Sequence, residues 1–240
     1  MDDLELFYKN NYVVRFLFCI LYIITIIIRI IYKRLEFDKF NRLIKLIISG
    51  LAFYIFLLYN GIGQSYTSGN YKFLFWNKHF IYTPVIFYIK IFICLIAICI
   101  FISLLDYFQY EKFVSYELPI LILLCLEGAF LLISANDYFV MYIALELQSI
   151  PLYILTSSKR YSNVSVEAGL KYFIYGSFAS GMILYGISLI YGSLGVTDFS
   201  RILLLLYFMT LDGEFSLSLF VGFLLVCLGL LFKLGIAPMH

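Results

Sequence analysis

Charge is what this sequence has least of. Only 13% of its 240 residues are charged, against about 25% in a typical soluble domain. The hydrophobic share is 63%, and the mean hydropathy is +0.97. So few charges cannot cover a water-soluble globule, which excludes a soluble enzyme and predicts an integral membrane protein. The net charge of +2 also predicts no nucleic-acid partner.

Metal and cofactor motifs are also lacking. The five cysteines lie inside apolar runs and show no CxxC or Cys/His spacing. We expect them to act as small buried hydrophobic residues, with no metal and no cofactor held by this chain. The start Met1-Asp2-Asp3 is acidic, and the first apolar run is too long for a signal peptide, so no cleavable leader is predicted.

Alanine and proline are scarce, whereas isoleucine, lysine and asparagine are frequent and the chain holds 25 Phe and 22 Tyr. The frequent residues have A/T-rich codons. This bias favours a compact organellar genome, and an A/T-rich bacterium is the alternative.

The apolar residues gather in long runs. A membrane-crossing helix needs about 20 mostly apolar residues. Six runs reach that length, and a seventh begins near Phe215. The run Ile202–Leu211 is too short to span and is expected to lie in the interface or against a neighbouring helix. The six long runs are about Val13–Tyr32, Leu43–Gly63, Phe80–Leu105, Leu118–Ser134, Tyr138–Thr156 and Ala168–Leu194. We therefore predict an all-α, polytopic transmembrane bundle of about seven helices.

Basic residues predict the orientation of these helices. The loop after the first run holds Lys33, Arg34, Lys39 and Arg42, and Lys159 follows the fifth run. Basic loops stay on the inner side of a membrane. The N-terminus is therefore predicted outside.

Two ionisable residues stand where charge is costly. Glu146 is near the middle of the run Tyr138–Thr156, and Lys233 follows the apolar run Leu217–Phe232. Each costs several kcal/mol in a membrane unless it is paired or hydrated. We predict that they form a buried acid–base pair. The alternatives are a purely structural role for Glu146 and a Lys233 side chain that reaches the interface.

Helix breakers follow Lys233 at once. Gly235 and Pro238 are expected to interrupt the seventh helix, since proline removes a helical hydrogen bond. Unwound backbone in a membrane occurs where it lines a cavity or is buried in protein. His240 would extend this polar region as a possible relay group, or it is simply solvated.

Further ionisable residues lie within the spans. Lys171 follows Glu167 at the i,i+4 spacing of a helical ion pair, so it is either a member of a polar axis or a plain helix-end pair. Lys90 and Glu127 are weaker candidates without a partner spacing. The pairs Gly176/Ser180 and Ser177/Gly181 predict close packing of the sixth helix.

Several motifs resemble one known family. Glu117-Leu-Pro-Ile, Ile133-Ser-Ala-Asn-Asp137 and Ala144-Leu-Glu-Leu-Gln-Ser-Ile-Pro-Leu-Tyr153 resemble the fourth and fifth helices of the subunit 2 family of NADH dehydrogenase (respiratory complex I). Glu167-Ala-Gly-Leu-Lys-Tyr-Phe173 and Leu231-Phe-Lys-Leu-Gly-Ile-Ala-Pro-Met-His240 continue the resemblance. It covers residues 117–240 in order, whereas 1–116 match only in having three hydrophobic spans.

The resemblance implies a proton-translocating, antiporter-like subunit in a mitochondrial inner membrane, or in a bacterial inner membrane if the gene is not organellar. It implies two regions, 1–116 with three helices and 117–240 as the first antiporter-like repeat, half of an inverted-repeat fold. Glu146, Lys171 and Lys233 match the family's proton-carrying positions. Redox chemistry, with NADH and quinone, would occur in other subunits.

The family's second repeat is not found in these 240 residues. We therefore expect a separate chain to supply the C-terminal half, in contact with the seventh helix, other complex I membrane subunits and lipids; a partial sequence is the alternative. Two competing functions stay open. One is an Mrp-type cation/proton antiporter subunit, and the other is a structural membrane subunit that does not pump.

Overall fold

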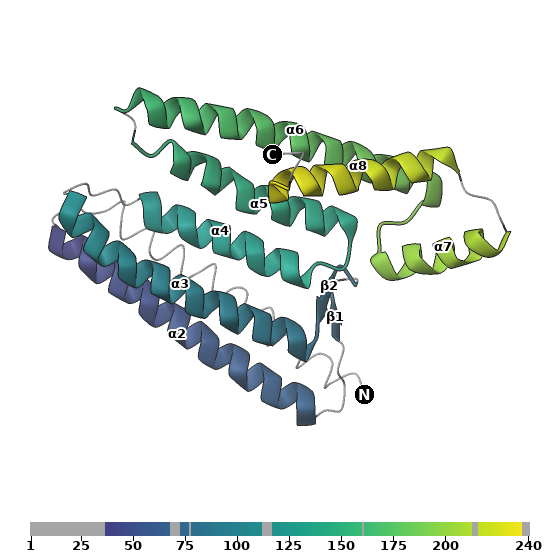
Figure 1. The fold of residues 1–240 in the computed structure, drawn as a ribbon. Helices are drawn as coiled ribbons and strands as arrows, with labels where there is room; N and C mark the ends of the chain where they lie inside the picture. The colour runs from purple at the N-terminus through teal and green to yellow at the C-terminus, as the bar shows by residue number, and fades with distance from the viewer. Residues whose placement is uncertain are drawn as a thin grey trace. The chain divides into compact units, whose positions relative to one another are not determined.

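The computed structural model describes residues 37–67, 73–76, 78–111, 117–159, 161–212 and 216–236. The predicted span at about Val13–Tyr32, together with Pro238 and His240, lies outside these residues. The described helices are α2 (Phe37–Thr67), α3 (Pro84–Glu111), α4 (Glu117–Ser134), α5 (Tyr138–Thr156), α6 (Asn163–Leu194), α7 (Phe199–Asp212) and α8 (Leu217–Leu234), and two short strands, β1 (Phe73–Phe75) and β2 (Phe80–Tyr82), precede α3 (Figure 1).

The chain forms two compact units. Unit 1 comprises residues 1–75 and 82–123, and unit 2 comprises 76–81 and 124–240. Unit 1 holds α2, α3 and the start of α4, whereas unit 2 holds the rest of α4 and helices α5 to α8. The boundary between 116 and 117 that the family resemblance implies stays a prediction.

The helical, membrane-spanning architecture is confirmed. Five of the described helices, α3 to α6 and α8, are long and apolar enough to cross a membrane. The apolar part of α2, Leu43–Tyr59, is shorter than a full span, and α7 is short, as the run Ile202–Leu211 predicted. The predicted count of seven spans is therefore not reached among the described residues.

Several helix boundaries differ from the predictions: α2 is longer at both ends and α3 runs on to Glu111, and two helix starts have a local explanation. The third span begins at Pro84, because residues Phe80–Tyr82 form a strand. Proline suits the first turn of a helix, where its missing N–H is not needed. The sixth helix begins at Asn163 rather than near Ala168, and its N-cap Ser162 accepts a hydrogen bond from the Ser165 N–H. A prediction from hydrophobicity alone does not include this polar first turn of the helix.

Unit 1 contains the packed pair α2 and α3, which run side by side (Figure 1). Leu58 and Phe87 are buried between them, against Tyr54, Tyr82 and Ile91. Lys90 is buried on α3, and its Nζ lies 4.8 Å from the centre of the Tyr82 ring. The Lys90 ammonium is therefore held in part by a cation–π contact.

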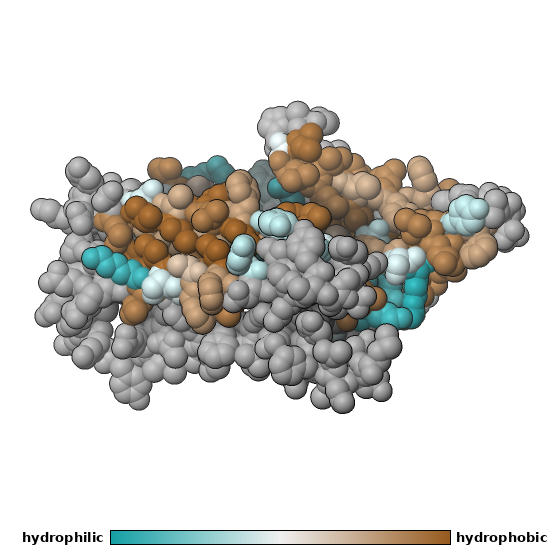
Figure 2. Space-filling model, turned by 90° about the horizontal axis from the view of Figure 1, so that it is seen from below, coloured by the Kyte–Doolittle hydropathy of each residue, from teal (hydrophilic) through white to brown (hydrophobic). Residues whose placement is uncertain are grey.

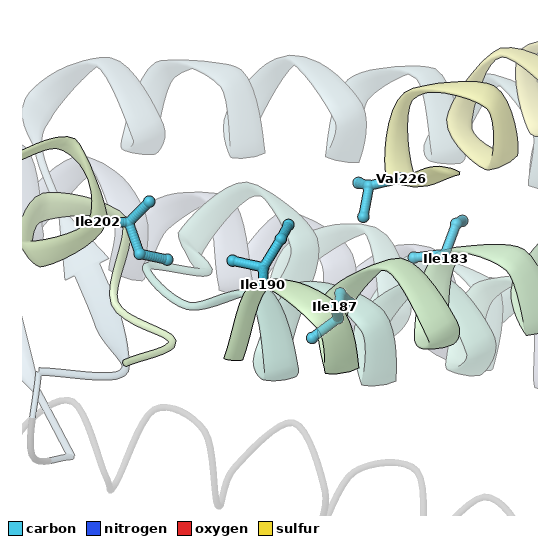
Figure 3. Packing of buried hydrophobic residues seen from close by; sticks show 5 residues of the cluster. All are labelled: Ile183, Ile187, Ile190, Ile202 and Val226. Atoms are coloured by element: carbon cyan, nitrogen blue, oxygen red, sulfur yellow. The ribbon is translucent and has the colours of Figure 1, made fainter. Parts of the chain in front are cut away.

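The core of unit 2 lies between α6 and α8. Figure 3 shows Ile183, Ile187, Ile190, Ile202 and Val226 gathered there from α6, α7 and α8. Helices α5, α6 and α8 run alongside one another (Figure 1). The aliphatic cluster thus fixes α6 against α8, the helix that carries Lys233.

Glycines bring the two helix backbones together. A Cβ added to Gly186 would lie 2.7 Å from the backbone oxygen of Gly222, and one added to Gly229 would lie 2.9 Å from that of Ala179. Only a residue without a side chain permits this approach. The predicted close packing of α6 is correct for Gly176/Ser180, since a Cβ on Gly176 would collide with the Tyr153 ring and Ser180 is buried. It is wrong for Ser177/Gly181, whose residues are exposed.

The surface of the described residues is largely apolar. Figure 2 shows brown, hydrophobic atoms over most of the described surface in view. On α6, the side chains of Phe173, Ile174, Tyr175 and Phe178 are exposed. A soluble monomer does not expose such a surface, so it is suited to contact with lipid or with another membrane subunit.

The cysteines divide between the interior and this surface. Cys94 is buried, as predicted, whereas Cys99 and Cys227 are exposed on spans α3 and α8. The prediction of burial was wrong for these two residues. A thiol in a membrane helix can face either lipid or protein. The hydrophobicity of the run therefore does not predict whether a cysteine points into the bundle or out of it.

Replacing Gly186 by alanine tests the α6–α8 contact. The new methyl group would meet a backbone oxygen that cannot rotate away, and overpacking costs about 1–3 kcal/mol. We expect a lower thermal unfolding midpoint in detergent. Gly181→Ala is the control, because a Cβ there meets nothing within 4 Å among the described atoms; alanine should leave its midpoint unchanged or slightly raised. Equal midpoints would show that the close contact is not needed.

Candidate functional site

A carboxylate and a lysine meet between two membrane helices of unit 2. The Nζ of Lys233 on α8 lies 3.3 Å from the Oε1 of Glu146 on α5. Their side chains are 15% and 26% exposed, respectively. The structure therefore brings together the two residues for which the sequence predicts pairing.

Helix α5 presents Glu146 through its local sequence. Pro151 lies one turn later, inside the helix, and having no N–H it cannot bond to the backbone oxygen of Leu147. The hydroxyl of Ser149 donates to the backbone oxygen of Glu146 at 3.2 Å. Gly128 of α4 allows close packing here, because a Cβ would lie 2.7 Å from the Gln148 nitrogen. Glu146 is thus held on a tightly packed segment.

Helix α8 ends directly after Lys233. Gly235 has a positive φ of 64°, which suits a residue without a Cβ. Its N–H donates to the Phe232 oxygen at 3.1 Å, and the Ile236 N–H donates to the Leu231 oxygen at 3.3 Å. This pair of bonds is a Schellman motif, which stops a helix. The interruption that Gly235 predicts is therefore confirmed.

The other predicted site residues are placed differently. The Nζ of Lys171 lies 2.6 Å from the Oε1 of Glu167, and both side chains are 65% exposed. This is the helix-end ion pair that the i,i+4 spacing allows. Glu127 is half-buried on α4, Lys90 belongs to unit 1, and His240 lies outside the described residues.

A second polar group in unit 2 was not predicted. The side chain of His79 bonds to that of Asp137, a residue with 0% exposure, and Asp198 lies beside them. Burial raises the pKa of Asp137 above its ordinary value; Asp198 raises it further, and His79 opposes the shift. Since the three residues are far apart in sequence, only the fold brings them together.

The arrangement of the first group can hold and transfer a proton. A lysine beside a carboxylate retains its proton, and loss of that partner in apolar surroundings favours release. Interrupted helices beside buried polar groups mark ion sites in many transporters, so the geometry is that of an antiporter-like membrane protein.

Comparisons with known proteins show what the chain is similar to. Residues 135–240 match the family model described as NADH:quinone oxidoreductase/Mrp antiporter, transmembrane. NADH-ubiquinone oxidoreductase chain 2 of Oenothera berteroana is 40% identical over 167 residues, which are 70% of this chain and 34% of that protein. The chain thus spans about a third of the length of this curated relative.

Solved structures share the fold. A chain of respiratory complex I from Thermus thermophilus matches with a TM-score of 0.67 and 23% identity, over 94% of this chain and 45% of that one. A chain of the Mrp complex from Dietzia sp. matches with a TM-score of 0.66 and 19% identity, over 93% and 41%. Residues 135–240 are thus similar to the NADH:quinone oxidoreductase/Mrp antiporter transmembrane family, and the chain shares the fold of these membrane subunits.

A double-mutant cycle measures the Glu146–Lys233 contact. Glu146→Leu or Lys233→Met alone should destabilise the protein, because each leaves its partner charged and unpaired in apolar surroundings. The double variant should be more stable than either single one, with a coupling of about 0.5–3 kcal/mol. Thermal unfolding in detergent gives the four values. If the stability lost in the double variant equals the sum of the losses in the two single variants, the two side chains do not interact.

Proposed function

We propose that the chain forms part of the proton-translocating membrane subunit of respiratory complex I that corresponds to subunit 2. The observation that carries this proposal is the Glu146–Lys233 pair, at 3.3 Å between two membrane helices. The relative named NADH-ubiquinone oxidoreductase chain 2 supports the choice of complex. Reduction of quinone by NADH is proposed to occur in other subunits.

The pair suggests how a proton would move. The Glu146 carboxylate lies next to Lys233 and can pair with its ammonium form. A conformational change that separates the two groups would leave this charge in apolar surroundings, so the lysine would release its proton. Helix α8 ends at Leu234, next to Lys233, and carbonyl oxygens of a last helical turn that capping bonds leave unpaired can accept hydrogen bonds from water. In this proposal, proton release by Lys233 depends on making and breaking its ion pair with Glu146.

Lys171 and His240 are proposed as further relay groups. Lys171 is well exposed in its pair with Glu167, so its entry into a proton path requires that this pair open. His240 follows the helix end in sequence. Both assignments rest on the family motifs rather than on a contact with Glu146 or Lys233.

The proposed partners follow from the length of the relatives. The matched relative is about three times as long as the aligned part of this chain, so the rest of its fold must be supplied. We propose a separate chain as the source, with other complex I membrane subunits and lipid as further neighbours. Further residues of the same polypeptide are the alternative. The proposed location is a mitochondrial inner membrane, or a bacterial inner membrane.

An Mrp-type cation/proton antiporter is the second candidate. The family model covers both classes, and the Mrp complex from Dietzia sp. has a similar fold. At 19% identity that similarity concerns the fold alone. A structural subunit whose charges only pair is the third candidate, and it predicts that pumping does not depend on the pair.

Native electrophoresis tests the choice of complex. We expect a mild-detergent blue-native gel of the source membrane to place this chain in a large band that stains for NADH oxidation. Mass spectrometry of the band should also find peptides matching the second half of chain 2. Peptides continuous with residue 240 would show one polypeptide, and a separate chain would show a split subunit. A band without NADH oxidation would favour the antiporter.

Substitution of the pair tests the mechanism. Glu146→Gln and Lys233→Ala should remove most NADH-driven proton translocation in membrane vesicles, because each abolishes the ion pair that is proposed to open and close. Lys45→Ala is the matched control, since Lys45 is an exposed lysine of α2, and it should pump normally. Assembly is checked on the same gel. Normal pumping by both variants at normal assembly would establish the structural role instead.

A further inference from the structure

Three connecting segments of unit 2 meet at Asn136. Its N–H donates to the backbone oxygen of His79 at 2.9 Å, and its side-chain Nδ2 donates to that of Lys78 at 2.8 Å. Its own backbone oxygen accepts from the Phe199 N–H at 3.1 Å. These bonds join the segment before β2, the α4–α5 connection and the α6–α7 connection.

This backbone frame gathers three ligand-type side chains. One nitrogen of His79 and one carboxylate oxygen each from Asp137 and Asp198 all lie within 4.8 Å of one another. Backbone pairing of Asp137 with Asp198 holds the two carboxylates in register. The cluster is thus built by the fold rather than assembled from flexible surface residues.

Asp137 is the unusual member of the cluster. It occupies the N-cap position of α5 but makes no side-chain capping bond; its Oδ2 bonds to His79 instead. Its Oδ1 is buried and has no hydrogen-bond partner among the described residues. A buried carboxylate oxygen without a donor is costly, and a second carboxylate beside it adds repulsion. A cation would remove both costs.

We propose that His79, Asp137 and Asp198 bind a divalent transition-metal ion of the Zn²⁺ type. One imidazole nitrogen and two carboxylate oxygens form a ligand set that suits Zn²⁺, with water in the fourth position. A histidine nitrogen disfavours Mg²⁺ and Ca²⁺, which prefer oxygen ligands. Around a tetrahedral ion with ligand bonds of 2.0–2.2 Å, two ligand atoms lie about 3.4 Å apart, so binding requires side-chain rotations that adjust the present spacing.

The surroundings of the cluster would let a metal ion enter and would balance its charge. The side chain of His79 is 48% exposed, which opens the cluster to water, whereas that of Asp198 is 15% exposed. Arg201 lies 3.1 Å from the Oδ2 of Asp198 and is 62% exposed. The Arg201 guanidinium can keep its ion pair with the Oδ2 of Asp198 and so orient the carboxylate, as hydrogen-bonding neighbours of metal ligands do. The other carboxylate oxygen would then bind the ion.

Metal content of the purified assembly tests this inference. The assembly containing the full chain is stripped with a chelator, dialysed against buffered free Zn²⁺ and measured by plasma mass spectrometry. We expect the wild type to hold one more Zn²⁺ ion than Asp137→Asn or His79→Gln. Glu167→Gln is the control, because it removes a carboxylate from an exposed ion pair and should retain the wild-type content.

A second measurement keeps the test decisive if Asp137→Asn fails to assemble. His79→Gln changes an exposed side chain, so its assembly should persist, and Zn²⁺ should raise the unfolding temperature of the wild type but not of this variant. Zinc-edge X-ray absorption should show nitrogen and oxygen ligands without sulfur. Equal Zn²⁺ contents in assembled wild type and His79→Gln would overturn the metal site. The alternative would then be a proton shared by the carboxylates of Asp137 and Asp198.

Discussion

A charge inside a membrane bundle needs a partner, and the Glu146–Lys233 ion pair meets this requirement at 3.3 Å. The two residues are 87 positions apart, so their meeting requires α5 and α8 to be held in register by α6 between them. The Gly186–Gly222 approach and the aliphatic cluster around Ile183 provide this register. The packing of these glycine and isoleucine residues therefore decides whether Glu146 and Lys233 can form their ion pair.

The pair is only partly buried, which matters for its function. A fully enclosed ion pair would be difficult to break, because both charges would lose their only stabilising partner. Here both side chains retain some exposure, and α8 ends at Leu234, one residue beyond the lysine, where the last carbonyl groups have no partner within the helix itself. The same helix end that stops α8 thus leaves polar backbone close to the group that would carry the proton.

The sequence predicted the features that depend on local pattern. The bounds of α4 and α5 agree with their apolar runs within one residue, and the pairing of Glu146 with Lys233 followed from the cost of charge in lipid. It could not predict which face a small residue takes, so Gly181 was placed in a contact it does not make. Nor could it predict the group His79, Asp137 and Asp198, because their spacing carries no motif and only the converging connections bring them together.

Helix α5 joins the two polar regions of unit 2. Asp137 precedes its first turn and Glu146 lies nine residues later, which is about 13 Å along the helix axis. Between them, Ala144 is buried and the helix is continuous. A rigid helix transmits position along its length, so the bonds that fix Asp137 at one end also set the depth of Glu146. The carboxylate that pairs with Lys233 is therefore positioned as much by the connections at the end of the bundle as by the helices around it.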